Sequence, residues 1–373
     1  MEILSCENVA FKYNESTDYA ISDCTFSVKK GEKIMLCGAS GSGKSTLLRL
    51  LKRELSPRGE LSGDITLMGK DRSELSDRES AEKIGFVMQS PDSQTVCDKV
   101  SAELAFGLES FGVKSGEIQS RVGEMAAFFG IEPLYDRDIS TLSGGQKQLV
   151  ALCSVMATDP DILLLDEPTA QLDPIAAREL LGILDRLNKE MGVTIIIAEH
   201  DPEELFDSCD KILYLANGKT EFFGTPTLTA KYFVKNALEG FLPETAKAFA
   251  RLCDDLPLNV RQGRAKFEKL GVTDIPKQAV TDTDRVEPYA LQCKNLWQRY
   301  EKNSPDILKG CDLSIRKGEC YGLLGSNGGG KSTLLRVICG LCKPYMGTVS
   351  LFGKKQKAYK NGSLFREMLA FLP

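Results

Sequence analysis

Two short glycine-rich segments of this chain have a spacing suited to holding phosphate groups. Residues 38–45 read GASGSGKS and residues 325–332 read GSNGGGKS, so both fit the pattern Gly-x-x-x-x-Gly-Lys-Ser. In such a loop, backbone N–H groups and a helix N-terminus face the phosphates, the lysine neutralises the terminal ones, and the serine hydroxyl reaches Mg²⁺. We name these segments loop 1 and loop 2. The alternative is a chance glycine-rich turn, which two matches in one chain disfavour.

The two loops belong to a longer internal repeat. Lys44 and Lys331 are separated by 287 positions, and the same offset relates a tyrosine, a cysteine and a glycine upstream of each loop. A constant offset without gaps indicates two copies of one domain. Past the loops the register slips slightly, and residues 369–373 correspond to residues 84–88. A strand is therefore expected over residues 369–372.

Acidic residues and a histidine follow two apolar runs. Asp166 and Glu167 end the run ILLLDE, and His200, the only histidine, directly follows residues 193–199. Strand ends in a parallel sheet are where ligands gather, so Asp166 suits a Mg²⁺ contact. Glu167 could orient or deprotonate an attacking water. Taken singly, a strand-end Asp-Glu pair is more often a solvated edge, and a lone histidine is more often structural.

A second candidate anion site lies at residues 142–146, which read LSGGQ. Ser143 with the amides of Gly144 and Gly145 would form a helix N-terminus that attracts negative charge. The alternative is an ordinary serine cap followed by glycines.

The elements that must position these residues follow from the pattern of apolar side chains. Strands are predicted before loop 1 over residues 3–9, 25–28 and 34–37, and a helix from Lys44. A helical lobe is predicted over residues 99–111, 116–129 and 144–157. Beyond it, a parallel sheet with crossover helices is predicted from strands at 162–166, 193–198 and 211–216 and helices at 174–190 and 202–208.

This organisation predicts three parts. Residues 1–226 form a complete domain, residues 227–287 form a helical connector, and residues 288–373 repeat the N-terminal part of the first domain. The connector balances its positive and negative charges and has apolar residues at helical spacing, so it is neither a flexible linker nor a basic arm.

Composition narrows the class of protein. The chain has 373 residues, of which 42% are hydrophobic and 27% charged, with a net charge of -5. Its apolar runs are far shorter than the roughly 20 residues needed to span a bilayer. No basic cluster stands out, so no nucleic-acid partner is expected. The 12 cysteines are scattered, which favours reduced thiols and a cytosolic setting.

The order of these motifs resembles the nucleotide-binding domain of ABC ATPases over residues 1–226. The resemblance rests on Tyr13, GASGSGKS, Gln89, LSGGQ, ILLLDE, Asp173 and His200. It implies an α/β P-loop NTPase fold with an antiparallel β subdomain and a helical subdomain, followed by a partial second copy. It also implies that the cofactors are ATP and Mg²⁺.

The resemblance implies a role for each matched residue. Tyr13 would stack on adenine, although a core aromatic is the alternative. Gln89 would link Mg²⁺ and the attacking water to the membrane partner, Asp173 would join the subunit interface, and His200 would contact the γ-phosphate. The predicted catalytic residues are Lys44, Gln89, Glu167 and His200. The predicted metal ligands are Ser45, Gln89, Asp166 and Ser332.

The predicted nucleotide-binding residues fall in both copies. In the first copy they are Tyr13, Gly38, Ala39, Ser40, Gly41, Ser42, Gly43, Lys44, Ser45, Thr46, Ser143, Gly144, Gly145, Gln146 and Asp173. In the second copy they are Tyr300, Gly325, Ser326, Asn327, Gly328, Gly329, Gly330, Lys331, Ser332 and Thr333. Two positions depart from the family pattern: Leu149 where arginine is frequent, and Glu199 where a small or hydroxyl residue often precedes the histidine.

Three segments are similar to ATPases of energy-coupling factor importers. They are QSPDSQ at residues 89–94, VSAELAFG at residues 100–107 and EPTAQLDP at residues 167–174. This resemblance implies an ATPase subunit held at the cytoplasmic face of the membrane by a transmembrane coupling protein. A small substrate-binding membrane protein would capture a vitamin or metal ion. The alternatives are another class of ABC transporter, a soluble twin-domain ABC protein acting on ribosomes or DNA, and a second half that only binds or regulates.

In this family each ATP lies between the P-loop of one domain and the LSGGQ of another. Residues 288–373 show no counterpart to Gln89, Glu167 or His200 and no LSGGQ. The resemblance therefore implies a second ATPase domain as partner, in a homodimer or a paralogue. It also leads us to expect a fragment of a longer two-domain ATPase or an incomplete gene.

Overall fold

The computed structural model describes residues 1–200, 202–269, 288–301, 304–359 and 369–371. The chain divides into two compact units, Met1–Ile275 and Pro276–Pro373. Each is described by itself, as unit 1 and unit 2. Among the described residues, no helix is both long enough and apolar enough to cross a bilayer.

Unit 1 contains an antiparallel sheet of four strands in the order β2-β1-β4-β5. Its strands are β1 (Glu2–Tyr13), β2 (Ile21–Lys29), β4 (Gly59–Leu67) and β5 (Lys70–Asp71). The apolar side chains of β1 and β2 alternate between buried and more exposed positions, which is typical of a sheet with one face on the core.

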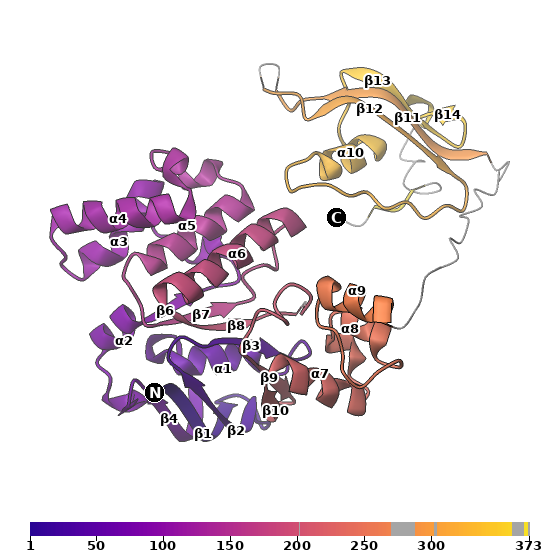
Figure 1. Cartoon of the computed structure of the whole chain (residues 1–373). Helices are drawn as coiled ribbons and strands as arrows, with labels where there is room; N and C mark the ends of the chain where they lie inside the picture. The colour runs from indigo at the N-terminus through magenta and orange to yellow at the C-terminus, as the bar shows by residue number, and fades with distance from the viewer. Residues whose placement is uncertain (201, 270–287, 302–303, 360–368, 372–373) are drawn as a thin grey trace. The chain divides into compact units, whose positions relative to one another are not determined.

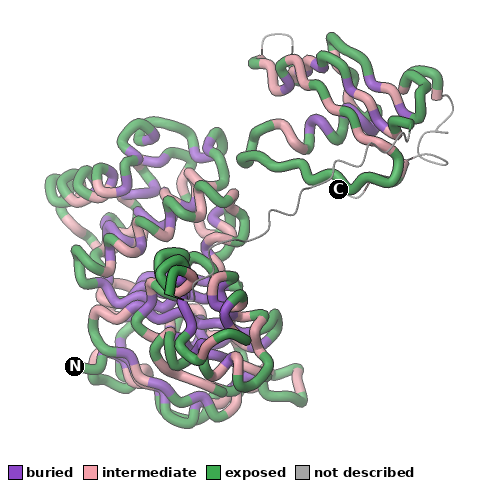
Figure 2. Tube along the Cα trace, turned by 45° about the vertical axis from the view of Figure 1, so that its right-hand side comes forward, coloured by how far each residue is buried: buried purple, intermediate pink, exposed green. Residues whose placement is uncertain are grey.

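The second sheet of unit 1 has six strands in the order β10-β9-β3-β8-β7-β6. Its strands are β3 (Lys33–Cys37), β6 (Ile84–Val87), β7 (Ile162–Asp166), β8 (Thr194–Ala198), β9 (Lys211–Ala216) and β10 (Lys219–Gly224). All are parallel except β10, which pairs antiparallel with β9. Every residue of β3, β7 and β8 is buried, because layers cover both faces of this sheet (Figure 2).

Helices cover the six-stranded sheet on both sides (Figure 1). On one side lie α3 (Val100–Ser110), α4 (Ser115–Phe129), α5 (Gly144–Met156) and α6 (Pro174–Met191). On the other side, α1 (Lys44–Leu51) packs its leucines between the two sheets, and α2 (Asp77–Lys83) precedes β6. These bounds confirm the predicted helices to within two residues. The fold is thus the predicted P-loop α/β architecture with an antiparallel and a helical subdomain.

One predicted helix is absent. Residues 202–208 form turns. Leu205 and Phe206 point into the core, as the apolar spacing suggested, but only short-range bonds such as Phe206 N–H to the Pro202 carbonyl close the segment. The described backbone hydrogen bonds of this segment run only to the Pro202 and Leu205 carbonyls, so the consecutive i→i−4 bonds of an α-helix do not form.

The segment after β10 forms helices that belong to unit 1 and share the apolar core on one side of the six-stranded sheet. They are α7 (Pro226–Lys235), α8 (Glu244–Phe249) and α9 (Val260–Lys269). The Tyr214 ring of β9 lies 5.1 Å from Phe233 and 5.3 Å from Phe241, and these side chains share one apolar core. The rest of the predicted connector, residues 270–287, lies outside the described residues. Short 3₁₀ turns occur at Arg53–Leu55, Arg72–Glu74, Pro91–Ser93, Glu132–Leu134, Ile139–Thr141, Glu239–Phe241 and Gln356–Ala358.

Unit 2 repeats the antiparallel sheet and the helix after the loop. Its strands are β11 (Tyr289–Gln298), β12 (Leu308–Arg316), β13 (Met346–Leu351) and β14 (Lys354–Lys355), in the order β12-β11-β13-β14. The helix α10 (Lys331–Ile338) follows loop 2. This strand order matches that of β2-β1-β4-β5 in unit 1.

The strand predicted over residues 369–372 is not found. Residues 369–371 have no regular structure, and Leu372 lies outside the described residues. Residues 319–326, which correspond to the region of β3, also form no strand. In unit 1, β6 pairs with β7 and β3 pairs with β8 and β9. The described part of unit 2 contains no strand that could pair with these two segments in the same way.

Candidate nucleotide-binding site

Loop 1 follows β3 at the carboxyl edge of the six-stranded sheet, and close packing requires its glycines. A Cβ atom at Gly38 would lie 2.2 Å from the carbonyl oxygen of Leu215. A Cβ atom at Gly43 would lie 2.6 Å from the carbonyl oxygen of Ala20, and Gly43 also has a φ of 103°. Only glycine fits both positions, so the backbone can curl tightly ahead of α1.

The polar groups of loop 1 fit a phosphate chain. Lys44 is only 4% exposed, and its Nζ donates to the carbonyl oxygens of Gly38 at 2.8 Å and Ala39 at 3.1 Å. Burial lowers the pKa of the Lys44 ammonium, while the carboxylate of Glu167 opposes this shift. The buried Oγ of Ser42 has no hydrogen-bond partner among the described residues. An anion at this helix N-terminus would satisfy that hydroxyl and pair with the ammonium.

Ser45 and Asp166, two of the predicted metal ligands, are hydrogen-bonded to each other. The Ser45 Oγ donates to Asp166 Oδ1 at 2.7 Å, and Asp166 is 5% exposed at the end of β7. A hydroxyl and a carboxylate are the oxygen ligands that Mg²⁺ takes beside phosphates. The described residues hold no group of three or more His, Cys, Asp or Glu side chains around a common point.

Two predicted catalytic side chains, Gln89 and His200, contact the carboxylate of a third, Glu167. Glu167 Oε2 accepts a hydrogen bond from Gln89 Nε2 at 2.9 Å, and Glu167 Oε1 lies 2.7 Å from His200 Nε2. These residues follow β6, β7 and β8, whose carboxyl ends share one edge of the sheet. Glu167 has a φ of 49°, which is unusual for a residue with a Cβ atom. The structure thus holds this carboxylate in a fixed direction beside loop 1.

Tyr13 lies at the end of β1, next to the start of α1. Its hydroxyl is 2.9 Å from Thr46 Oγ1, and its ring packs edge-on against Phe11 at 5.0 Å. The ring is half-buried. The hydroxyl contact to Thr46 places Tyr13 beside the start of α1, directly after loop 1.

Two predicted segments do not join this cluster in the single chain. Ser143 caps α5, and its hydrogen bonds in the described residues run to and from Gln146 within the cap. Gly144 is exposed and Gly145 half-buried beside it. Asp173 caps α6 by accepting from the N–H groups of Ile175 and Ala176 at 3.0 Å.

Sequence reasoning missed a contact beside the cluster. Glu199 is 4% exposed, and its Oε1 accepts from the N–H of Thr169 at 3.0 Å and from its Oγ1 at 2.7 Å. Burial raises the pKa of Glu199 to about 7. The acid before the histidine was visible in the sequence, but Thr169 carries no signal that would pair the two.

In unit 2, loop 2 has the same internal bonds but different surroundings. Lys331 Nζ donates to the carbonyl oxygens of Gly325 at 2.7 Å and Ser326 at 2.8 Å. Tyr300 repeats the tyrosine contact, with its hydroxyl 3.1 Å from Thr333 Oγ1. Ser332, by contrast, has no hydrogen bond to a carboxylate among the described residues, and residues 321–329 are all exposed.

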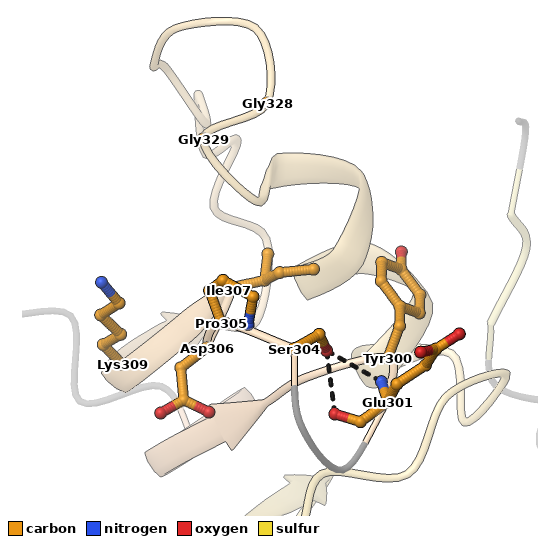
Figure 3. Close-up of a pocket in the computed structure, with 9 residues that line it drawn as sticks. All are labelled: Tyr300, Glu301, Ser304, Pro305, Asp306, Ile307, Lys309, Gly328 and Gly329. Atoms are coloured by element: carbon orange, nitrogen blue, oxygen red, sulfur yellow. Dashed lines mark hydrogen bonds between the residues drawn. The ribbon is translucent and has the colours of Figure 1, made fainter. Parts of the chain in front are cut away.

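Beside loop 2, Tyr300 borders an open cavity of about 650 Å³ (Figure 3). Gly328 and Gly329 line it from the loop. Opposite them the turn at residues 304–307 is closed by Ser304, whose Oγ bonds the Glu301 backbone at 2.9 and 3.0 Å.

The phosphate loop, the strand-end carboxylates and the helical lobe define an ATP-binding cassette fold. The sequence profile of the ABC transporter family matches residues 21–170 and 308–373, and the chain therefore belongs to this family. A putative ABC transporter ATP-binding protein of Bacillus thuringiensis is 41% identical over 349 residues, which cover 93% of this chain and 63% of that protein. One from Caldanaerobacter subterraneus is 36% identical over 366 residues, covering 94% of this chain and 64% of that protein. The chain thus spans less than two thirds of the length of these curated relatives.

Solved structures agree with the family. The structure of cbiO1 from Clostridium perfringens, described as part of the ABC transporter complex cbiONQ, is 31% identical with a TM-score of 0.57. The match covers 71% of this chain and 98% of that one. A dimeric ATP-binding cassette in a post-hydrolysis state, bound to ADP and Pi, is 27% identical with a TM-score of 0.53, covering 60% of this chain and 99% of that one.

Proposed function

We propose that unit 1 binds ATP with Mg²⁺ at loop 1 and hydrolyses it to drive a membrane transporter. One observation carries the proposal. Gln89 and His200 both contact the Glu167 carboxylate, which lies beside a phosphate loop whose lysine is buried. Phosphoryl transfer depends mainly on positioning and charge stabilisation, and this arrangement supplies both.

Each residue has a chemical task in this proposal. The loop 1 amides and Lys44 bind the phosphates, and Ser45 with Asp166 would hold Mg²⁺. When bound, Mg²⁺ would neutralise charge that develops on the phosphate oxygens. The Glu167 carboxylate orients the attacking water and accepts its proton. His200 and Gln89 hold that carboxylate in place through the bonds at 2.7 and 2.9 Å.

We propose that a second ATPase domain completes the site, in a homodimer or with a paralogue. Ser143 and Gly144 are exposed at the N-terminus of α5 and take no part in the cluster around loop 1. A partner's phosphates could therefore reach this helix end. The dimeric cassette among the similar structures supports this arrangement.

The proposed transporter is an importer of the energy-coupling factor type for a vitamin or metal ion. The similarity to cbiO1, together with the segment at residues 89–94, supports this class. Its partners would be a transmembrane coupling protein and a small substrate-binding membrane protein, which would hold the chain at the cytoplasmic face of the membrane. The alternative is the ATPase of another ABC transporter class.

We further propose the domain layout of 1–226, 227–287 and 288–373 within a longer two-domain ATPase. The family profile matches two separate segments, and the relatives are longer than this chain. The repeated strand order and loop geometry support a second copy of the domain.

The test of ATP hydrolysis compares the wild-type chain with Glu167→Gln. The variant keeps the shape of the side chain but loses the base, so turnover should fall by about 10²- to 10⁴-fold while MgATP binding persists. Phosphate release and binding of a fluorescent ATP analogue report the two properties, and sedimentation in MgATP reports whether the variant dimerises. Glu117→Gln, on the exposed face of α4, is the matched control. Equal turnover in all three proteins would contradict the assignment of Glu167.

The transport assignment has its own test. The tagged chain is recovered from detergent-solubilised membranes of its source, and co-purifying proteins are identified by mass spectrometry. Small multi-span partners would support an importer. Recovery without membrane proteins, or with ribosomal or DNA-repair proteins, would contradict it and leave the ATPase proposal standing.

A further inference from the structure

Glu199 is a buried carboxyl group directly beside the catalytic cluster. It follows β8 and precedes His200, and only 4% of it is exposed. Acidic side chains are almost never fully buried unless their oxygens are hydrogen-bonded, because desolvation of the charge is costly. The bonds that hold Glu199 therefore indicate what this residue does.

Thr169 donates two hydrogen bonds to Glu199 Oε1, and the backbone of His200 also bonds the Glu199 carboxylate. The backbone N–H of Thr169 donates at 3.0 Å and its Oγ1 donates at 2.7 Å. Thr169 is two residues after Glu167, with the buried Pro168 between them. Glu199 thus joins the end of β8, which carries His200, to the turn that carries Glu167.

The turn that Glu199 fastens needs support. Glu167 has a φ of 49°, a conformation that L-residues rarely adopt and that persists only where the surroundings hold it. On one side, the Glu167 N–H donates to the carbonyl of Ala198 at 2.9 Å. On the other side, the pair of bonds from Thr169 to Glu199 fixes the chain as it leaves Glu167.

The same pair of bonds also reaches the segment that leads to Asp173. The carbonyl of Thr169 accepts from the N–H of Leu172 at 2.9 Å, one residue before Asp173 caps α6. Thr169 therefore connects the turn that carries Glu167 to the segment that leads to Asp173, which is predicted to lie at the subunit interface.

We propose that Glu199 is a positioning residue for ATP hydrolysis, which acts by holding Thr169 and so fixing the direction of the Glu167 carboxylate relative to loop 1. This inference rests on the proposed function. It predicts that losing the Glu199–Thr169 bonds slows the chemical step and leaves nucleotide binding largely intact. Neither side chain has a described hydrogen bond to loop 1, and the Glu199 carboxylate acts on Lys44 only through its charge, which Glu199→Ala and Glu199→Gln remove alike.

Four single variants and one double variant test the inference through kcat and KM for MgATP. Glu199→Ala and Thr169→Val remove the bonds, and kcat should fall by about 10- to 100-fold while KM changes less than about threefold. Glu199→Gln keeps an Oε1 acceptor and Thr169→Ser keeps the hydroxyl, so both should retain kcat within about threefold. The double variant Thr169→Val/Glu199→Ala should lose no more than the stronger single variant, since both act through one contact.

The outcomes separate a positioning role from a purely structural one. Rescue of kcat by Glu199→Gln and Thr169→Ser, with KM unchanged, would support the inference. A folded Glu199→Ala variant with wild-type kcat, or equal losses in the conservative and disruptive variants, would overturn it. If Glu199→Ala fails to fold, Thr169→Val, a half-buried position, carries the same test. Failure of the proposed function itself would appear separately, as wild-type turnover that Glu167→Gln does not reduce.

Discussion

Loop 1 and loop 2 have nearly the same shape in very different surroundings. Their glycines have matching φ values: 156°, 78° and 103° at Gly38, Gly41 and Gly43, and 156°, 78° and 89° at the corresponding positions of loop 2. In both loops the lysine amine bonds the first two carbonyls. Lys44 is nevertheless buried, whereas loop 2 is largely exposed.

The difference shows which features of the site depend on the residues of the loop itself and which depend on packing against distant segments. The glycines and the lysine suffice to form the loop, because they satisfy its bonds within eight residues. The proposed metal ligand Asp166 ends β7, and the proposed base Glu167 and His200 follow β7 and β8. Of these two strands β8 pairs with β3, and β7 lies on the other side of β8. In the described part of unit 2 no strand lies beside residues 319–326, so this part shows the shape of the loop without counterparts of Asp166 and Glu167.

Matched alanine substitutions at the first glycine of each loop should sharpen this comparison most. A Cβ atom at Gly38 would overlap the Leu215 carbonyl at 2.2 Å, whereas at Gly325 it would meet only the Lys331 side chain at 4.0 Å. Gly38→Ala should therefore destabilise unit 1 by about 2–4 kcal/mol, and Gly325→Ala should cost less than half as much.

The single tryptophan makes this measurement selective. Trp297 lies on β11 in unit 2, so its fluorescence reports that unit, while far-UV circular dichroism in urea is dominated by unit 1. Gly38→Ala should shift the dichroism midpoint and leave the fluorescence transition in place. Equal shifts for both substitutions would mean that the two loops are packed alike, contrary to the structure.

The stability of unit 1 should depend on pH through Glu199. Burial raises the pKa of this residue from its ordinary 4.5 to about 7. The folded state then holds the proton more tightly than the unfolded state, so stability falls as pH rises from about 4.5 to 7 and stays reduced above that range. Glu199→Gln removes this cost. The variant should gain about 1–3 kcal/mol relative to wild type between pH 5 and pH 8 in urea unfolding. A difference between the two proteins that does not change with pH would show that Glu199 titrates normally.

The sequence predicts a structural feature well when the residues that form it lie close together in the chain. The loops, α1 and the buried strand β7 follow from residue patterns within about ten positions, and the structure has them. The helix predicted at residues 202–208 and the strand predicted at 369–372 are wrong. The first segment lacks consecutive i→i−4 hydrogen bonds, and the second has no described strand to pair with. The Glu199–Thr169 contact joins residues 30 positions apart through packing, and no pattern in either segment indicates it.

Removing the tyrosine hydroxyl beside each loop should have the smallest effect, and this effect should be equal in the two units. Tyr13→Phe and Tyr300→Phe each remove one hydroxyl contact to a threonine, at 2.9 and 3.1 Å, and keep the ring. Each should cost about 0.5–1.5 kcal/mol or less of nucleotide binding or stability, as for a single half-exposed hydrogen bond. Isothermal calorimetry with ADP measures the first and urea unfolding the second. A loss more than tenfold larger at one tyrosine would break the local equivalence of the two loops.

The central claim is that the proposed ATP hydrolysis by this chain takes place at loop 1, and steady-state ATP hydrolysis by Lys44→Ala and Lys331→Ala tests it most directly. Both substitutions remove an amine that bonds its own loop in the same way, so they are matched in local effect. The account predicts that Lys44→Ala lowers turnover by about 100-fold or more, while Lys331→Ala retains it within about threefold. Turnover that survives Lys44→Ala but is lost in Lys331→Ala, or that falls equally in both, would contradict the account.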